Sequence, residues 1–143
     1  MKKNYIESEV LIIGAGFIGQ IMALMLASSK IKVTLVDKNE FIRCDTRTTA
    51  ISQGSARIYN KIGIWKDLVK YSQPIYKIKV TEGSEVNGLI FNHEMTEEGV
   101  MGYIVENKFI KKFLLAKVLK SKVIKMYSNN LVKSIRSLEN KTL

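Results

Sequence analysis

A glycine-rich segment followed by one acidic residue is the feature of this sequence best suited to bind a ligand. The segment Gly14-Ala15-Gly16-Phe17-Ile18-Gly19 matches the pattern G-x-G-x-x-G, and Asp37 follows 18 residues after its last glycine. The first glycine allows a tight turn, the second leaves room for a diphosphate, and the third lets a helix pack closely on a sheet. An acidic residue at this distance accepts hydrogen bonds from a ribose. The segment therefore predicts a dinucleotide site; the alternative is a similar turn that holds no nucleotide.

The residues around this segment predict the strand, turn and helix that such a site requires. Residues 9–13 and 32–36 are β-rich runs, and residues 17–28 between them suit a helix. Together they make one βαβ unit, whose helix N-terminus offers unpaired N–H groups and roughly half a positive charge to an anion. Residues 10–27 carry no charge and so also resemble a signal peptide or membrane helix, but three glycines interrupt them. We therefore expect an α/β, Rossmann-like fold with a βαβ unit at its N-terminus.

The rest of the chain alternates further strands and helices. A loop is expected over residues 38–50, then a helix from the N-cap Ser52 to Lys61 that stops at Gly63, and a short helix over 64–69. Further strands are predicted at 75–81, 88–92, 102–105, 123–127 and 131–138. The strand over 75–81 is expected to be half-buried and to form a hairpin with 88–92. The strands over 123–127 and 131–138 are expected to form a second hairpin. After residue 105, a helix is predicted whose apolar stripe holds the i,i+4 pairs Phe109/Phe113 and Leu115/Leu119.

Composition narrows the class of protein. With 143 residues, 46% of them hydrophobic and 25% charged, the chain suits one globular domain rather than a disordered, collagenous or disulfide-rich protein. Its one cysteine, Cys44, and one histidine, His93, cannot supply an internal disulfide or a Cys- or His-based structural metal site. A net charge of +10 suggests nucleic acid, anionic lipid or an acidic ligand as a partner, but the lysines are scattered. A solvated lysine-rich surface in a reducing, cytoplasmic compartment is the simpler interpretation.

Further sequence blocks carry a resemblance to a known family. They follow the glycine segment in order: Asp45-Thr46-Arg47, then residues 50–55 (AISQGS), 62–65 (IGIW) and 102–107 (GYIVEN). In content, order and spacing these blocks resemble the flavin-dependent aromatic hydroxylases of ubiquinone biosynthesis. The glycine segment is common to many FAD and NAD proteins, whereas the later blocks are more specific.

The resemblance implies an FAD-dependent monooxygenase, an oxidoreductase in which NAD(P)H reduces the flavin and O2 is then used to hydroxylate an aromatic ring. The implied cofactor-binding residues are Gly14, Ala15, Gly16, Phe17, Ile18, Gly19, Asp37, Lys38 and Arg47. Arg47 corresponds to a flavin-contacting arginine, and a guanidinium there can bind diphosphate oxygens at two points. The family often has proline in place of Phe17 and arginine in place of Lys108. No catalytic residue and no metal ligand is assigned.

The resemblance extends over nearly the whole chain but little more than a third of a typical family member. Residues 1–143 are therefore predicted to be the N-terminal part of an FAD/NAD(P)-binding domain, truncated at the C-terminus and inactive alone. A second polypeptide that completes the fold, a prenylated or other phenol as substrate, and peripheral association with the inner face of a membrane are further expectations. The alternatives are a small NAD-binding module or reductase, a non-catalytic basic binding protein, and the non-functional product of an interrupted gene. The Asp-x-Arg and Val-Glu-Asn blocks favour the FAD enzyme.

Overall fold

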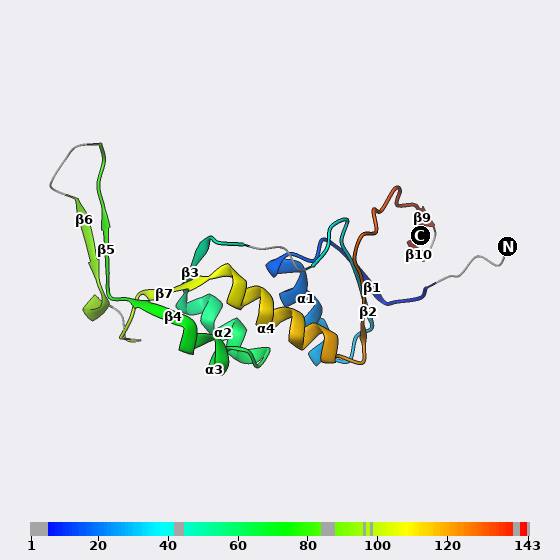
Figure 1. Ribbon diagram of the computed structural model, residues 1–143, viewed down its shortest axis with the longest axis horizontal. Helices are drawn as coiled ribbons and strands as arrows, with labels where there is room; N and C mark the ends of the chain where they lie inside the picture. Colours follow the sequence, from blue (N-terminus) through cyan, green and yellow to red (C-terminus); the bar gives the residue numbers. More distant parts are fainter. Residues whose placement is uncertain are drawn as a thin grey trace. The chain divides into compact units, whose positions relative to one another are not determined.

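The structure is a computed structural model that describes residues 6–41, 45–83, 88–95, 97, 99–138 and 141–142. Cys44 lies outside these residues. The chain divides into two compact units, one formed by Met1–Arg43 with Leu114–Leu143 and the other by Cys44–Phe113. Figure 1 traces the chain through its strands and helices.

The first unit is built on three parallel strands in the order β1-β2-β8. β1 (Val10–Ile13) pairs with β2 (Val33–Val36), which also pairs with β8 (Ile124–Tyr127). α1 (Phe17–Ser28) connects β1 to β2 and packs on all three strands. The predicted βαβ unit is confirmed, and its bounds differ from the prediction by at most one residue. The uncharged stretch over 10–27 is thus divided between β1, the glycine turn and α1, and no helix in the described part of the chain could span a membrane.

The centre of the first unit is its middle strand. Val33 and Leu35 of β2 are 1% and 0% exposed, as expected for a parallel strand with neighbours on both sides. α1 buries Ala23 and Leu24. β1 is an edge strand, and Ile13 at its end is 53% exposed.

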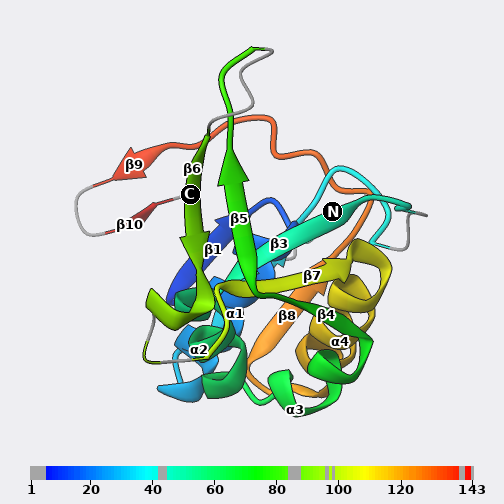
Figure 2. The same cartoon turned by 90° about the vertical axis from the view of Figure 1, so that its left-hand side faces the viewer.

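The second unit contains an antiparallel sheet in the order β3-β7-β4, seen in Figure 2 with α2 and α3. Its strands are β3 (Thr48–Ser52), β7 (Gly102–Glu106) and β4 (Ser72–Ile75), and its helical segments are α2 (Gln53–Lys61), α3 (Trp65–Leu68), the 3-10 turn η1 (Val69–Tyr71) and the start of α4 (Asn107–Lys120). α2 begins as predicted, because Ser52 Oγ accepts a hydrogen bond from the Ser55 N–H at 3.2 Å. Trp65 fills the space between Tyr59 and Tyr103, with ring centroids 6.4 and 4.8 Å away.

A separate two-stranded ribbon also belongs to the second unit. β5 (Lys77–Val80) and β6 (Leu89–Asn92) run antiparallel, side by side in Figure 2, and the 3-10 turn η2 (His93–Met95) follows. The predicted hairpin is confirmed, but the prediction of a half-buried strand is wrong: every residue of β5 is exposed. The alternation of Ile78 and Val80 with lysines does give the ribbon one apolar face. Among the described residues, however, these two strands pair only with each other.

Two predictions about strand pairing are wrong. Part of the expected loop over 38–50 is β3, whose partner β7 lies about fifty residues later and cannot be recognised locally. The segment 123–127 is indeed a strand, β8, but it pairs in parallel with β2 rather than in a hairpin with residues 131–138. Most of 131–138 has no regular structure; only β9 (Ser137–Leu138) is a strand, and it pairs with β10 (Lys141–Thr142).

The helix after β7 is confirmed as α4, but its predicted apolar stripe is wrong. The side chains with 0–1% exposure are Ile110, Leu114 and Val118, whereas Leu119 is 68% exposed. Phe109 stacks on Tyr71, with ring centroids 4.2 Å apart, at the edge of the buried face. Apolar residues at i,i+4 spacing occur on adjacent faces of this helix, so periodicity alone could not choose between them.

Candidate cofactor-binding site

The glycine segment forms the turn that its spacing predicts. Gly14 adopts φ +106°, a conformation that side-chain-bearing residues rarely adopt, and its N–H donates to the Val36 carbonyl at 2.8 Å. Gly19 lies against this turn: a Cβ there would be 3.1 Å from the Gly14 carbonyl carbon and closer still to its oxygen. α1 can therefore pack this closely on the turn only with glycine at position 19.

The N-terminus of α1 is open toward solvent. A Cβ added at Gly14 or Gly16 would meet no atom within 4 Å. Gly16 is the N-cap and offers no capping side chain, and the first turn of α1 contains no acidic residue. Because the first N–H groups of a helix have no partner within it, this end can accept an anion.

Two side chains form hydrogen bonds with the backbone of Ala15, one with its N–H and the other with its carbonyl. The Ala15 N–H donates to Asp37 Oδ2 at 2.7 Å, and Gln20 Nε2 donates to the Ala15 carbonyl at 2.7 Å. Gln20 is 4% exposed, and its Oε1 has no hydrogen-bond partner among the described residues. The carboxylate of Asp37 thus lies at the glycine turn, as predicted. Burial alone would raise its pKa, but the hydrogen bonds from the N–H groups of Asn39 and Ala15 outweigh burial and lower it.

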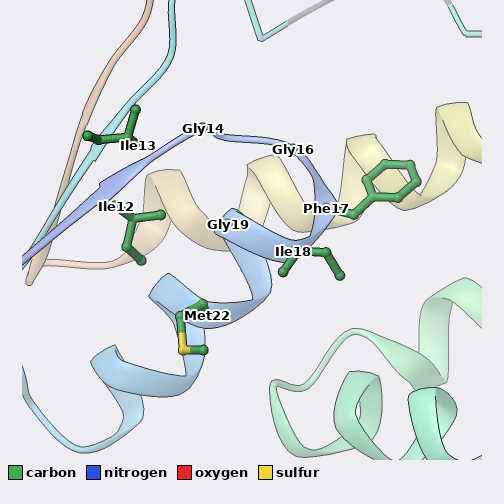
Figure 3. A pocket seen from close by; sticks show the side chains of 8 residues that line it. All are labelled: Ile12, Ile13, Gly14, Gly16, Phe17, Ile18, Gly19 and Met22. Atoms are coloured by element: carbon green, nitrogen blue, oxygen red, sulfur yellow. The ribbon is translucent and has the colours of Figure 1, made fainter. Parts of the chain in front are cut away.

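An open depression of about 620 Å³ borders the turn (Figure 3). Its lining is the backbone of the glycine segment together with apolar side chains of β1 and α1: Ile12, Ile13, Phe17, Ile18 and Met22. Ile18 and Met22 are 78% and 51% exposed. The side chains of Phe17 and Ile18, two predicted site residues, therefore line the depression with apolar surface and add no polar group to it.

Arg47 belongs to the second unit, where it forms a two-point ion pair with Asp45. Arg47 Nε donates to Asp45 Oδ1 at 2.9 Å, and Nη2 donates to Oδ2 at 3.0 Å. Hydrogen bonds from Arg47 and then Lys111 hold the pKa of Asp45 far below its usual range, and the hydrogen bond to Asp45 raises the pKa of Arg47.

Lys38 and Lys108 occupy exposed positions. Lys38 follows Asp37 directly, and its charge contributes to lowering the pKa of that carboxyl. Lys108 pairs with Glu106, Nζ to Oε2 2.6 Å, and lies over the ring of Phe109. This pairing gives Lys108 a local role that needs no ligand.

The sequence interpretation missed Gln20, and it did not connect Asp45 with Asn107. Asn107 Nδ2 donates to Asp45 Oδ2 at 3.2 Å. The joint presence of the Asp-x-Arg and Val-Glu-Asn blocks in the sequence is the signal that could have indicated this contact.

Comparison with known families and proteins agrees with the motif blocks. The family profile described as "FAD binding domain" matches residues 7–133. The chain is 32% identical over 117 residues to the ubiquinone hydroxylase UbiL of Rhodospirillum rubrum, an alignment that covers 78% of this chain and 27% of UbiL. It is 23% identical to the mitochondrial ubiquinone biosynthesis monooxygenase COQ6 of Dictyostelium discoideum, covering 94% of this chain and 31% of COQ6. The chain spans about 30% of the length of these curated relatives.

Solved structures share the fold. The p-nitrophenol 4-monooxygenase PnpA from Pseudomonas putida matches with a TM-score of 0.75 and 18% identity, over 92% of this chain and 34% of PnpA. The flavin-dependent monooxygenase PieE, solved in complex with FAD and substrate, matches with a TM-score of 0.76 and 15% identity, over 96% of this chain and 26% of PieE. At these identities the likeness establishes the fold alone.

The resemblance to flavin-dependent ubiquinone hydroxylases is therefore confirmed by the curated relatives. Because the family profile extends over most of the sequence, the chain belongs to the FAD binding domain family, whose cofactor is FAD.

Proposed function

We propose that this chain is the FAD-binding part of an NAD(P)H-dependent flavoprotein monooxygenase that hydroxylates an aromatic ring in ubiquinone biosynthesis. The observation that carries the proposal is the glycine turn, where Asp37 holds the Ala15 N–H and the N-terminus of α1 stays uncapped. The reaction and pathway are supported by the relatives named as ubiquinone hydroxylases.

The residues present fit FAD. The backbone at Gly14 and Gly16 leaves open space of the kind that a diphosphate needs for close approach to the N–H groups of α1. Asp37 accepts one backbone hydrogen bond at each oxygen, and each oxygen keeps a lone pair for a ribose hydroxyl. Arg47 is proposed to bind an anionic oxygen of the cofactor. Lys38 would moderate the negative charge of Asp37.

FAD, when bound and reduced by NAD(P)H, supplies the chemistry that activates O2 for hydroxylation. The contribution proposed for this chain is to bind and orient the adenosine and diphosphate portions. No residue of this chain is assigned to proton transfer or to contact with the phenol substrate.

Further polypeptide is proposed to complete the enzyme, as a continuation or as a second chain. The relatives are about three times as long as this chain. The apolar face of the ribbon also supports this, since Val80 and Leu89 are 54% and 63% exposed. Peripheral attachment to an anionic membrane surface is proposed from the net charge of +10.

FAD titration of the purified chain, followed by quenching of flavin fluorescence, tests the cofactor assignment. The wild-type chain should quench flavin fluorescence saturably. Gly16→Ala should bind FAD at least about tenfold more weakly, because its Cβ enters the space left for the diphosphate. The matched control is Gly54→Ala in α2, which places a methyl group in the second unit near the side chains of Arg57 and Ser52 and should leave affinity unchanged. No saturable binding by the wild-type chain would refute the proposed function, and unchanged affinity in Gly16→Ala would refute the use of this turn.

A further inference from the structure

Gln20 is a buried side chain at the glycine turn that uses only one of its two polar groups. It lies in the first half of α1 and is 4% exposed. Its Nε2 donates to the Ala15 carbonyl at 2.7 Å, whereas its Oε1 has no hydrogen-bond partner among the described residues. A buried amide whose oxygen stays unpaired adds little net stability, because that oxygen keeps its desolvation cost. The hydrogen bond to Ala15 therefore calls for an explanation other than the stability of the fold.

The backbone that Gln20 holds is conformationally permissive. Ala15 lies between two glycines, and Gly14 adopts φ +106°. Because glycine adopts many backbone conformations at little cost, the peptide group between Ala15 and Gly16 could rotate if nothing held it. The Gln20 side chain holds the carbonyl of Ala15, and the Gln20 backbone N–H donates to the carbonyl of Gly16 at 3.0 Å. The N–H of Ala15 donates to Asp37 Oδ2, so consecutive peptide groups of the turn are held.

A hydrogen bond to the Ala15 carbonyl also fixes the direction of an N–H group. The carbonyl of Ala15 and the N–H of Gly16 belong to one planar, trans peptide group, in which C=O and N–H point in opposite directions. Because the carbonyl is directed at Gln20, the Gly16 N–H points away from Gln20. Gly16 lines the open depression (Figure 3), and a Cβ there would meet no atom within 4 Å. Gln20 thus orients an N–H group at the helix end that can accept an anion.

We propose that Gln20 is a positioning residue of the cofactor site: it orients the peptide group between Ala15 and Gly16 so that the Gly16 N–H donates to a phosphate oxygen of FAD. The inference rests on the proposed function and concerns residues of the first unit alone. A ligand that binds a freely rotating peptide group must fix it on binding, whereas Gln20 has fixed this one beforehand. Gln20 contacts no cofactor atom in this role and acts only through the backbone of the turn.

Gln20→Met in the 143-residue chain tests this proposal, because methionine is a flexible side chain of similar length that donates no hydrogen bond. The matched control is Gln53→Met in the second unit, which removes an equivalent hydrogen bond, from Gln53 Nε2 to the Val100 carbonyl at 3.1 Å. FAD affinity is measured by quenching of flavin fluorescence, and far-UV circular dichroism and urea unfolding establish that each variant is folded. Gln20→Met should bind FAD about tenfold more weakly than the wild type, and Gln53→Met should bind it as tightly.

The possible outcomes separate the two proposals. A wild-type chain that binds no FAD would overturn the proposed function and this inference with it. A wild-type chain that binds FAD, with affinity unchanged in Gln20→Met, would overturn only the inference. Equal weakening in Gln20→Met and Gln53→Met would also overturn the inference, because the effect would then not depend on the glycine turn.

A measurement on the wild-type chain covers the case in which Gln20→Met does not fold. Nitrogen-15 NMR relaxation reports the order parameter of each backbone N–H, which is about 0.85 in rigid backbone and below about 0.6 in flexible backbone. In the wild type without FAD, the Gly16 N–H should be as ordered as the N–H groups in the middle of α1, and in a folded Gln20→Met variant its order parameter should fall. A flexible Gly16 N–H in the wild type would show that the peptide group is not held and would overturn the inference without any variant.

Discussion

Gly19 offers the sharpest test of how the glycine turn and α1 fit together. A Cβ at this position would lie 3.1 Å from the Gly14 carbonyl carbon, 3.4 Å from Ile12 Cγ2, and well within contact distance of the Gly14 oxygen. The obstacle is backbone, which cannot rotate away as a flexible side chain would. Gly19→Ala must therefore push α1 away from the end of β1.

The expected cost follows from two opposing effects. Overpacking a well-packed site costs about 1–3 kcal/mol, and a backbone obstacle places this site at the upper end of that range. Alanine is the better helix former by about 1 kcal/mol, which offsets part of that cost. The free energy of unfolding should therefore fall by about 2 kcal/mol in Gly19→Ala, a large fraction of the stability of a small protein.

Urea unfolding of the wild type, Gly19→Ala and Gly16→Ala, followed by far-UV circular dichroism, measures the change in the free energy of unfolding. Gly16→Ala is the matched control: three residues away, its Cβ meets nothing within 4 Å and its φ of −65° suits alanine. Alanine is a poorer N-cap than glycine but restricts the unfolded chain, so the two effects nearly cancel, to within about 0.5 kcal/mol. If Gly19→Ala were as stable as Gly16→Ala, the close contact between turn and helix would be refuted.

Two further predictions concern acid stability and activity. The hydrogen bonds from Arg47 and Lys111 keep the pKa of Asp45 far below its ordinary value of 3.8, so the unfolded chain takes up a proton that the folded chain does not. The stabilisation from Asp45 should be fully present above pH 3.8 and should decrease as the pH is lowered through that value and below it. In a pH series of unfolding curves, the free energy of unfolding should therefore decrease less steeply for Asp45→Asn than for the wild type. An equal decrease in both would contradict the low pKa of Asp45. The chain alone, with FAD, NAD(P)H and a phenol in air, should give no hydroxylated product by chromatography, because it spans about 30% of its relatives' length; stoichiometric product would show that this length suffices.

Local sequence patterns predicted the elements whose residues are contiguous. β1, α1 and β2 follow one another in 27 residues, so a change of hydrophobic period and three glycines were enough to place them. The start of α2 was equally readable, because Ser52 caps it through a residue three positions later. The orientation of Asp37 toward the turn followed from the same local geometry.

Pairing between distant segments was not predictable from one sequence. Local sequence predicts a loop at the start of β3 because Thr48–Ser52 gains its strand conformation from β7. It also predicts the wrong partner for β8, because the parallel neighbour β2 lies about ninety residues earlier. The contact between Asp45 and Asn107 joins residues 62 positions apart. Each of these contacts depends on how the whole chain folds, which local propensity does not encode.

The two aspartates show how hydrogen-bond partners determine the charge that a carboxylate presents to its surroundings. A bare carboxylate repels a diphosphate, so an acid near FAD must face a neutral part of the cofactor or be compensated by cations. Asp37 accepts hydrogen bonds from neutral backbone N–H groups and keeps its charge, which suits the hydroxyls of a ribose. Asp45 accepts hydrogen bonds from two cations, and the cluster of these three groups is left with a net positive charge. The partners of each aspartate, rather than the aspartate itself, therefore decide the local charge around it.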